Sequence, residues 1–261
     1  MRWSERQQAM LREIGVRLWL ADAAGATAGA TDCVAAPAST QVDPVSRPGA
    51  TRLPSAIGAG VSVDRSGTAL LDWPALAGHA AACTACALCA GRTRSVFGAG
   101  QLEADWMIVG DAPDEDDDRA GEPFAGKAGR LLDNMLAAMQ LTRGAAPRAS
   151  RVYLTQAVKC QPPGRRLPEP GEVARCEPFL LRQVQLVQPR IILAMGRTAS
   201  LSMLGTSEPI GKLRGRVHRY HGIPLVVTAS PAYLLRHPEG KADAWEDLCL
   251  ALESVKDSSS G

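Results

Sequence analysis

Apolar and polar residues alternate in blocks along the second half of the chain, and this pattern predicts strands separated by helices. Short apolar runs predict buried strands over residues 105–110, 152–158, 190–195 and 223–229. Apolar residues spaced three and four apart predict helices over residues 127–141, 172–187, 197–205 and 241–255. Such alternation favours parallel strands with helices on both faces of the sheet. The predicted fold class is α/β, a three-layer α/β/α sandwich around a mostly parallel four-stranded sheet.

The first part of the chain has a different character. Residues 1–20 have the spacing of a short amphipathic helix. Residues 21–70 are rich in Ala, Gly, Ser, Thr and Pro without strand or helix periodicity, which predicts a flexible linker. One folded domain is expected over residues 71–256, followed by a disordered tail at 257–261.

Composition excludes several classes of protein. No apolar run in the 261 residues approaches the ~18–20 needed to span a bilayer, so a membrane partner is not expected. The N-terminal segment MRWSERQQAMLREIG lacks the apolar core of a signal peptide. A cytoplasmic monomer of bacterial type is therefore expected.

The seven cysteines indicate a metal site rather than disulfides, because an odd number in a cytoplasmic chain does not suit a disulfide framework. Cys83 and Cys86 have the two-residue spacing of a chelating pair, and Cys160 and Cys176 form a second pair. Zinc and an iron–sulfur cluster both fit four thiolates. Cys89 would extend the first pair to CxxCxxC, as a rival ligand to Cys176. The alternative is that Cys160 and Cys176 are simply buried small hydrophobic residues.

Polar segments follow three of the predicted strands: GDAPDEDDD, KCQPP and SPAYLLR. Ligands of parallel sheets bind beyond the carboxyl ends of the strands, so these segments mark the predicted site. The acidic run 114–118 lacks the glycine and glutamate spacing of an EF-hand, so a solvated acidic loop is favoured over a cation site. His237, before Pro238, is interpreted as an exposed turn residue.

Charge is unevenly distributed along the chain. Residues 151–236 hold 13 Lys and Arg against 4 Asp and Glu, whereas residues 103–118 hold 8 acidic residues and no basic one. Such a basic region suits contacts with a phosphate backbone, which predicts DNA as the partner; a solvated surface with nothing bound is the alternative. The basic residues beside the motif loops are Lys159, Arg165, Arg166, Lys212, Arg214, Arg216 and Arg219.

Five segments, taken in chain order, closely resemble the family 4 uracil-DNA glycosylases, which are the iron–sulfur members of their superfamily. They are CTACALCAGRTRSVFGAG, DWMIVGDAPDEDDDRAGEPFAGKAGRLLD, VKCQPPG, LRGRVHRY and TASPAYLLR. The resemblance covers about residues 80–255 and does not extend to residues 1–70. It implies a DNA-repair enzyme that hydrolyses the N-glycosidic bond of uracil, or of another deaminated base, flipped out of single- or double-stranded DNA near the nucleoid.

The resemblance also assigns roles to residues. It implies a [4Fe–4S] cluster held by Cys83, Cys86, Cys160 and Cys176. In the base pocket, it implies a loop that includes Gly110 and Ala112, a stacking ring at Phe124 and a base-reading amide at Gln156. Catalytic roles fall on Asp111 and Ser230, and DNA contacts on Arg214, Pro231, Leu234, Leu235 and Arg236.

Three functional positions depart from the family pattern. Asp111 replaces a glutamate, Gln156 an asparagine and Ser230 a histidine. Each replacement keeps some polar capability, so a reshaped but working pocket is one hypothesis. The alternative is an iron–sulfur protein that binds DNA or a damaged base with impaired turnover. A zinc-stabilised binding module is a third interpretation.

Overall fold

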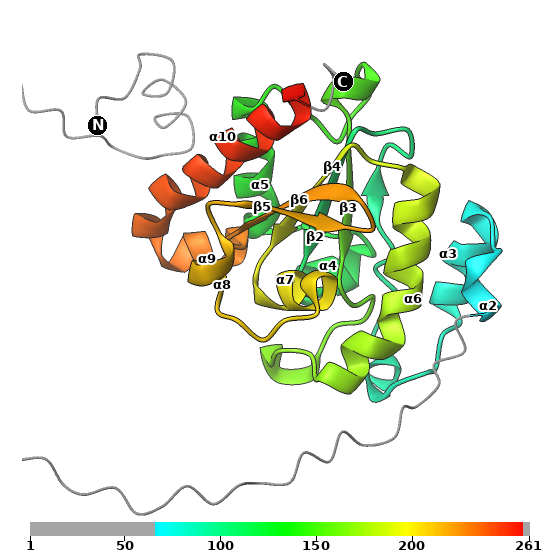
Figure 1. Cartoon of the computed structure of the whole chain (residues 1–261). Helices are drawn as coiled ribbons and strands as arrows, with labels where there is room; N and C mark the ends of the chain where they lie inside the picture. The colour runs from blue at the N-terminus through cyan, green and yellow to red at the C-terminus, as the bar shows by residue number, and fades with distance from the viewer. Residues whose placement is uncertain (1–65, 258–261) are drawn as a thin grey trace, which may run out of the picture. The chain divides into compact units, whose positions relative to one another are not determined.

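The computed structural model describes residues 66–257 (Figure 1). The predicted helix at 1–20, the linker up to residue 65 and the tail from 258 lie outside this range. Within the described residues, six strands form one sheet in the order β1-β3-β2-β4-β6-β5. Their bounds are Ala99–Gly100 (β1), Trp106–Gly110 (β2), Val152–Gln156 (β3), Ile191–Met195 (β4), Val217–Tyr220 (β5) and Ile223–Thr228 (β6).

The four predicted strands are the parallel centre of this sheet, β3-β2-β4-β6. The predicted strand number was too low, because β1 and β5 pair antiparallel at the two edges. β1 has only two residues, too few to give an alternating pattern. β5 is an edge strand in which Val217 and Arg219 are exposed, so it lacks the apolar run of a central strand.

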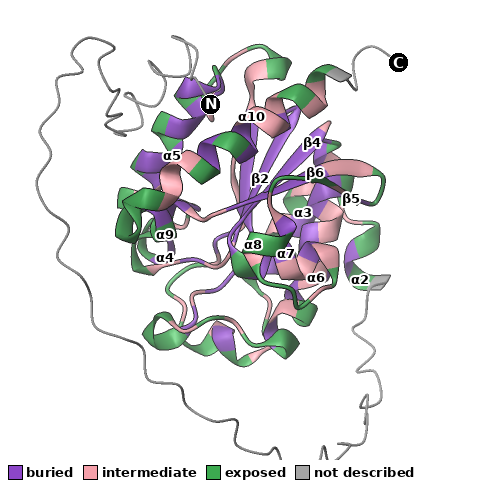
Figure 2. Cartoon of the chain, turned by 60° about the vertical axis from the view of Figure 1, so that its left-hand side comes forward, coloured by how far each residue is buried: buried purple, intermediate pink, exposed green. Residues whose placement is uncertain are grey.

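The described helices surround the sheet in two layers (Figures 1 and 2). α5, α9 and α10 share one buried cluster with one face of the sheet, and α6 and α7 share another with the opposite face, where α3 packs against α6. Their bounds are Ser66–Ala69 (α2), Trp73–Ala81 (α3), Glu115–Ala120 (α4), Lys127–Ala138 (α5), Pro170–Val187 (α6), Arg197–Leu204 (α7), Ile210–Leu213 (α8), Pro231–Arg236 (α9) and Lys241–Asp257 (α10), with 3₁₀ turns at Ala87–Ala90 (η1), Arg148–Ser150 (η2), Pro163–Arg165 (η3) and Pro238–Gly240 (η4).

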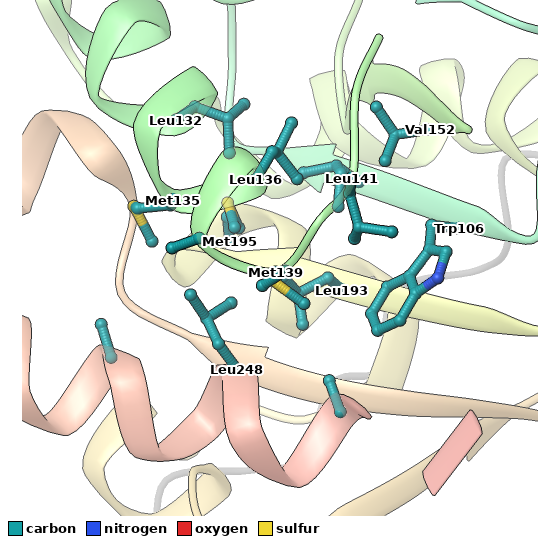
Figure 3. Packing of buried hydrophobic residues seen from close by; sticks show 14 of the residues in the cluster. Trp106, Leu132, Met135, Leu136, Met139, Leu141, Val152, Leu193, Met195 and Leu248 are labelled. Atoms are coloured by element: carbon teal, nitrogen blue, oxygen red, sulfur yellow. The ribbon is translucent and has the colours of Figure 1, made fainter. Parts of the chain in front are cut away.

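Alternate residues of each central strand enter opposite cores, which is why these strands read as continuous apolar runs. Ile108 and Leu193 face the α5–α10 side, whereas Met107 and Val109 face α6 and α7. Figure 3 shows the first core, in which helix residues such as Leu132 and strand residues such as Leu193 meet. Each fully buried side chain of this size contributes about 1.5–3 kcal/mol to the free energy of unfolding. This rigid centre fixes the strand ends from which the functional loops emerge.

Three segments differ from the sequence prediction. α2 lies within the predicted linker and packs against α6, so the folded part begins before residue 71. Residues 115–120 form α4 rather than a loop, because Asp114 caps the helix and Asp117 completes the capping box. Residues 231–236 form α9, with Pro231 at its first position. Within residues 66–257, no helix is both long enough and apolar enough to cross a bilayer.

Candidate functional site

The carboxyl ends of the parallel strands form one row of neighbouring residues. The last residue of β2, Gly110, is level with Gln156 of β3 and with Met195 of β4, and Met195 is level with Thr228 of β6. The polar loops that the sequence singled out follow these residues. The parallel register therefore brings together segments that lie more than a hundred residues apart in the chain.

Gly110, Phe124 and Gln156 are packed tightly at this edge. A Cβ atom on Gly110 would lie 2.6 Å from Phe124 Cζ and 3.3 Å from Gln156 Cγ. Phe124 is 8% exposed and has a φ of 58°, which an L residue rarely adopts. The aromatic ring, the amide and the bare backbone of Gly110 thus form one contiguous surface.

Replacing Gly110 by alanine is expected to lower the free energy of unfolding by about 1–3 kcal/mol, because the new methyl group overlaps the Phe124 ring. Thermal unfolding measures this loss. Gly78→Ala is the matched control, since a Cβ there meets nothing within 4 Å. Alanine in that helix should stabilise the protein by up to about 1 kcal/mol. Equal effects of the two substitutions would contradict the packing described for Phe124.

Gln156 is 2% exposed, and its amide is held by Asp117, itself 3% exposed. Gln156 Nε2 donates to Asp117 Oδ2 at 2.7 Å, and the backbone N–H of Ala125 donates to Asp117 Oδ1 at 2.7 Å. An ionised carboxylate only accepts hydrogen bonds, so it fixes which end of the amide faces it. Gln156 Oε1 is buried and finds no hydrogen-bond partner among the described residues. Burial raises the pKa of Asp117, and the hydrogen bond from Ala125 acts in the opposite direction.

The acidic run is therefore not the solvated loop that its composition suggested. Besides Asp117, Asp118 is only 4% exposed. Its carboxylate accepts hydrogen bonds from the backbone N–H groups of Thr93, at 2.8 and 3.0 Å, and of Arg94, at 3.3 Å. Asp117 thus orients the amide at the strand end, and Asp118 ties down the segment that follows the first cysteines.

Asp111 emerges from β2 and faces the first turn of α7. Asp111 Oδ1 accepts a hydrogen bond from the backbone N–H of Ala199 at 3.1 Å. Gly196 makes this approach possible, because a Cβ there would lie 2.1 Å from Asp111 Oδ2. Burial raises the pKa of Asp111 to about 6, although the backbone hydrogen bonds of Ala199, Thr198 and Arg197 lower it. The carboxyl group is therefore more readily protonated than that of an exposed aspartate.

Ser230 is the N-cap of α9. Its Oγ accepts a hydrogen bond from the backbone N–H of Tyr233 at 3.3 Å. A hydroxyl group has one proton to donate besides its lone pairs, so this cap leaves the proton available to a ligand. The side chain thus stabilises the helix and keeps a donor at the end of β6.

The structure corrects the DNA-contacting role of Leu234. This side chain is 1% exposed and packs in the core with residues of α5 and α10, so it cannot enter a duplex. Pro231 is also buried at the first position of α9. Leu235 is 45% exposed and remains at the surface, as does Arg236.

Tyr233 is a further surface residue of the same helix. It is 44% exposed, and its ring stacks on His237 with centroids 4.4 Å apart at 25°. Three-residue spacing on a helix could have indicated that Tyr233 and Arg236 share a face. His237 is exposed, as the sequence indicated, but it forms part of this stack.

Two members of the predicted basic surface face inward. Arg214 is paired with two carboxylates of α10: its Nε lies 2.8 Å from Asp247 Oδ2 and its Nη1 lies 2.8 Å from Asp243 Oδ2. Lys159 is 2% exposed, and its ammonium donates to Thr155 Oγ1, Gln156 O and Gln183 Oε1 at 2.6, 2.7 and 2.8 Å. Burial lowers the pKa of Lys159 to about 7. Lys159 is not placed to meet a phosphate, whereas Arg214 is partly exposed and paired with carboxylates, and its role as a DNA contact stays a prediction.

The cysteines singled out by the sequence line one cavity. Its lining includes Cys83 and Cys86, which are half-buried, and Cys160 and Cys176, which are buried. Cys89 lines the same cavity. None of these thiols forms a disulfide. The structure therefore brings the two predicted pairs together and adds a fifth thiol.

Basic and amide groups surround the same sulfur atoms. Arg92 Nη1 donates to Cys160 Sγ at 3.1 Å, and the backbone N–H of Lys159 donates to Cys176 Sγ at 3.3 Å. Arg175 also lines the cavity. Such donors stabilise thiolate ligands of a metal group.

The spacing of the sulfur atoms would differ between the two kinds of metal group. Within residues 66–257, no three His, Cys, Asp or Glu side chains are grouped so that they could hold a metal ion. Four sulfurs around one tetrahedral zinc would lie about 3.8 Å apart, from Zn–S bonds of about 2.3 Å. In a cubane each thiolate binds a different iron, so its sulfurs lie further apart. The cysteine ligand set by itself suits either zinc or an iron–sulfur cluster.

Comparisons with known proteins agree with this geometry. Residues 97–250 match the family model of the Uracil DNA glycosylase superfamily. The type-4 uracil-DNA glycosylase of Thermotoga maritima is 40% identical over 157 residues, 59% of this chain and 79% of that protein. The type-4 uracil-DNA glycosylase of Pyrobaculum aerophilum is 35% identical over 176 residues, 64% of this chain and 87% of that protein. The type-5 uracil-DNA glycosylase of the same organism is 32% identical over 149 residues, 52% of this chain and 64% of that protein. The chain therefore belongs to the type-4 uracil-DNA glycosylase family of this superfamily.

Proposed function

We propose that this protein is a DNA glycosylase that excises uracil from DNA. The observation that carries the proposal is the buried Gln156 amide, whose Oε1 is unpartnered beside the Phe124 ring and the bare backbone of Gly110. A buried acceptor without a partner is costly, and a ligand that donates to it removes that cost. A base inside a duplex reaches such a pocket only when it is flipped out and stacked on an aromatic side chain.

Gln156 would distinguish uracil from cytosine by its hydrogen-bonding pattern. Uracil N3 carries a proton that Gln156 Oε1 can accept, and uracil O4 can accept the second proton of Nε2. Cytosine presents an acceptor at N3 and an amino group at C4, so both contacts become mismatched. Asp117 keeps the amide in the required orientation because it already accepts one Nε2 proton. Fixed buried polar groups of this kind give large discrimination.

Asp111 and Ser230 would serve bond cleavage. When the N-glycosidic bond breaks, its electron pair moves to the base and positive charge develops on the sugar. Ser230 Oγ–H can donate to the uracil oxygen on which negative charge develops. An ionised Asp111 can stabilise the sugar cation or orient the water that attacks it. The products are free uracil and an abasic sugar.

Ionisation of Asp111 is expected to control both activity and stability. Because burial raises its pKa to about 6, release of uracil by the native protein should rise as pH increases through about 6. The same burial destabilises the native fold above that pH, where the carboxylate is charged, by about 2–3 kcal/mol. Asp111→Asn should therefore unfold at higher temperature than the native protein at pH 7.5, and this gain should disappear below about pH 4.

Single-turnover release of uracil from pH 5 to 8 and thermal unfolding at pH 4 and 7.5 measure these two effects. Asp133→Asn is the control, because Asp133 is an exposed carboxylate on α5. If the rate of uracil release depends on pH in the same way in Asp111→Asn as in the native protein, a group other than Asp111 causes the pH dependence.

We further propose that Cys83, Cys86, Cys160 and Cys176 hold a [4Fe–4S] cluster. The shared cavity and the hydrogen bonds to Cys160 and Cys176 support this assignment. When bound, the cluster would supply a structural cross-link rather than redox chemistry. Cys83 and Cys86 precede β1, whereas Cys160 follows β3 and Cys176 lies on α6, so the cross-link would join three separate segments.

The exposed face of α9 is the proposed wedge at the DNA surface. Leu235 and Tyr233 are both nearly half exposed, and Arg236 lies beside them. Apolar and aromatic side chains can fill the space that a flipped base leaves, and an arginine can contact the phosphate backbone. We propose that the protein acts on DNA as a monomer.

A second candidate function is a DNA- or damaged-base-binding protein with impaired turnover. Ser230 supports it, because a serine that caps α9 stands where the resemblance places a histidine. A single-turnover assay on uracil-containing single- and double-stranded DNA decides between the two. Free uracil released by the native protein establishes the glycosylase, whereas binding to uracil-containing DNA without release establishes the second function.

A further inference from the structure

The cavity of cysteines contains one thiol more than a four-iron cubane uses. Five cysteines line it, and the proposed cluster accounts for four of them. Cys89 is half-buried and is not in a disulfide. The position of this fifth thiol has a specific geometric cause.

Cys86 and Cys89 are at the two ends of one 3₁₀ turn. Cys86 is the N-cap of η1, and the backbone N–H of Cys89 donates to Cys86 O at 3.3 Å. This turn brings Cys86 and Cys89 close in space, and both side chains line the cavity. Leu88, 2% exposed, anchors the turn by packing in the core. The turn therefore presents both thiols to the same cavity.

Two of the other proposed ligands, Cys160 and Cys176, have no such substitute. Cys160 and Cys176 come from the loop after β3 and from α6, and the nearest cysteines in the chain lie at least sixteen residues away from each. Cys160 is also held by the guanidinium of Arg92. Exchange of a ligand without rearrangement of the fold is thus confined to the CxxCxxC segment, in which Cys86 and Cys89 share the turn of η1.

We propose that Cys89 is an exchange ligand that replaces Cys86 on the same iron of the cluster. The inference rests on the proposed cluster. In the exchange, the iron–sulfur bond to Cys86 breaks and an iron–sulfur bond to Cys89 forms. The proton of the Cys89 thiol passes to the departing Cys86 thiolate, so neither iron nor sulfur changes oxidation state. The exchange keeps four thiolates on the cluster when one ligand is lost.

Iron and sulfide content, together with visible absorbance, test the proposal on the full chain purified without oxygen. We expect the native protein, Cys89→Ser and Cys86→Ser each to retain about four irons per chain. Cys86→Ser/Cys89→Ser and the control Cys160→Ser should lose most of their iron. The proposal is overturned if Cys86→Ser loses iron as Cys160→Ser does, if Cys89→Ser alone loses it, or if the double variant keeps it.

A second measurement needs no variant that lacks one of the four proposed ligands, so it does not depend on whether such a variant folds. The lifetime of the cluster in the presence of a competing iron chelator should be several-fold shorter in Cys89→Ser than in the native protein. The reason is that, without the Cys89 thiol, no second cysteine can bind the iron that Cys86 releases. Equal lifetimes would overturn the exchange. Native protein without iron would instead refute the proposed cluster itself, so the two failures are distinguishable.

Discussion

Replacing Ser230 by histidine is expected to raise the rate of uracil release by about 10²–10³-fold. The physical reason is that an imidazole adds a stronger preorganised donor where negative charge develops on the base, and one such donor is typically worth this factor. Single-turnover release at saturating enzyme measures it, because binding and product release then do not mask the chemical step.

The same substitution should lower stability. Ser230 Oγ caps α9 through the backbone N–H of Tyr233, and loss of a serine cap costs about 0.5–2 kcal/mol. Ser230→Ala is the matched control, since it removes both the cap and the donor and should be slower than the native protein. If histidine gives no gain while alanine is neutral, Ser230 has no part in catalysis.

Gln156→Leu is expected to lower the rate of uracil release by about 10²–10³-fold. Leucine is close in shape to glutamine, but it removes the acceptor and the donor that would bind the uracil edge. Each lost hydrogen bond to a buried partner costs about 1–3 kcal/mol. Asp117 Oδ2 also loses the hydrogen bond that Gln156 Nε2 donates at 2.7 Å. The free energy of unfolding should therefore fall by about 1–3 kcal/mol.

Competition between uracil-containing and abasic DNA separates recognition from general damage to the fold. The variant should bind abasic DNA as the native protein does, because no base occupies the pocket there. Weaker binding to both kinds of DNA would mean that Gln156 supports the DNA surface as a whole and does not read the base.

Local patterns predicted the centre of the fold because buried parallel strands are continuous apolar runs. β2, β3, β4 and β6 lie where periodicity placed them. The same reasoning brought Gly110 and Gln156 to one edge, since parallel strands align their carboxyl ends. The joint cavity of Cys83, Cys86, Cys160 and Cys176 also agrees with the two predicted pairs.

Features that depend on burial could not be predicted in the same way. Leu234 and Leu235 are adjacent and identical in type, and only the docking of α9 decides that the first is buried and the second exposed. Arg214 and Lys159 were counted with the basic surface because charge usually indicates solvent exposure. Partners such as Asp247 of Arg214 and Gln183 of Lys159 are distant in the sequence and come close only through the tertiary fold.

The acidic residues of segment 114–118 are chemically similar but have different structural roles. Asp114 begins α4, Asp117 orients Gln156, and Asp118 fastens the chain beyond the cysteines, whereas Glu115 and Asp116 are exposed. Exchanging the positions of these residues would leave the net charge of the segment unchanged, yet it would remove the contacts that hold the Gln156 amide and the segment after the cysteines. In this protein, the positions of the acidic residues within the segment therefore matter for the structure in a way that their net charge does not show.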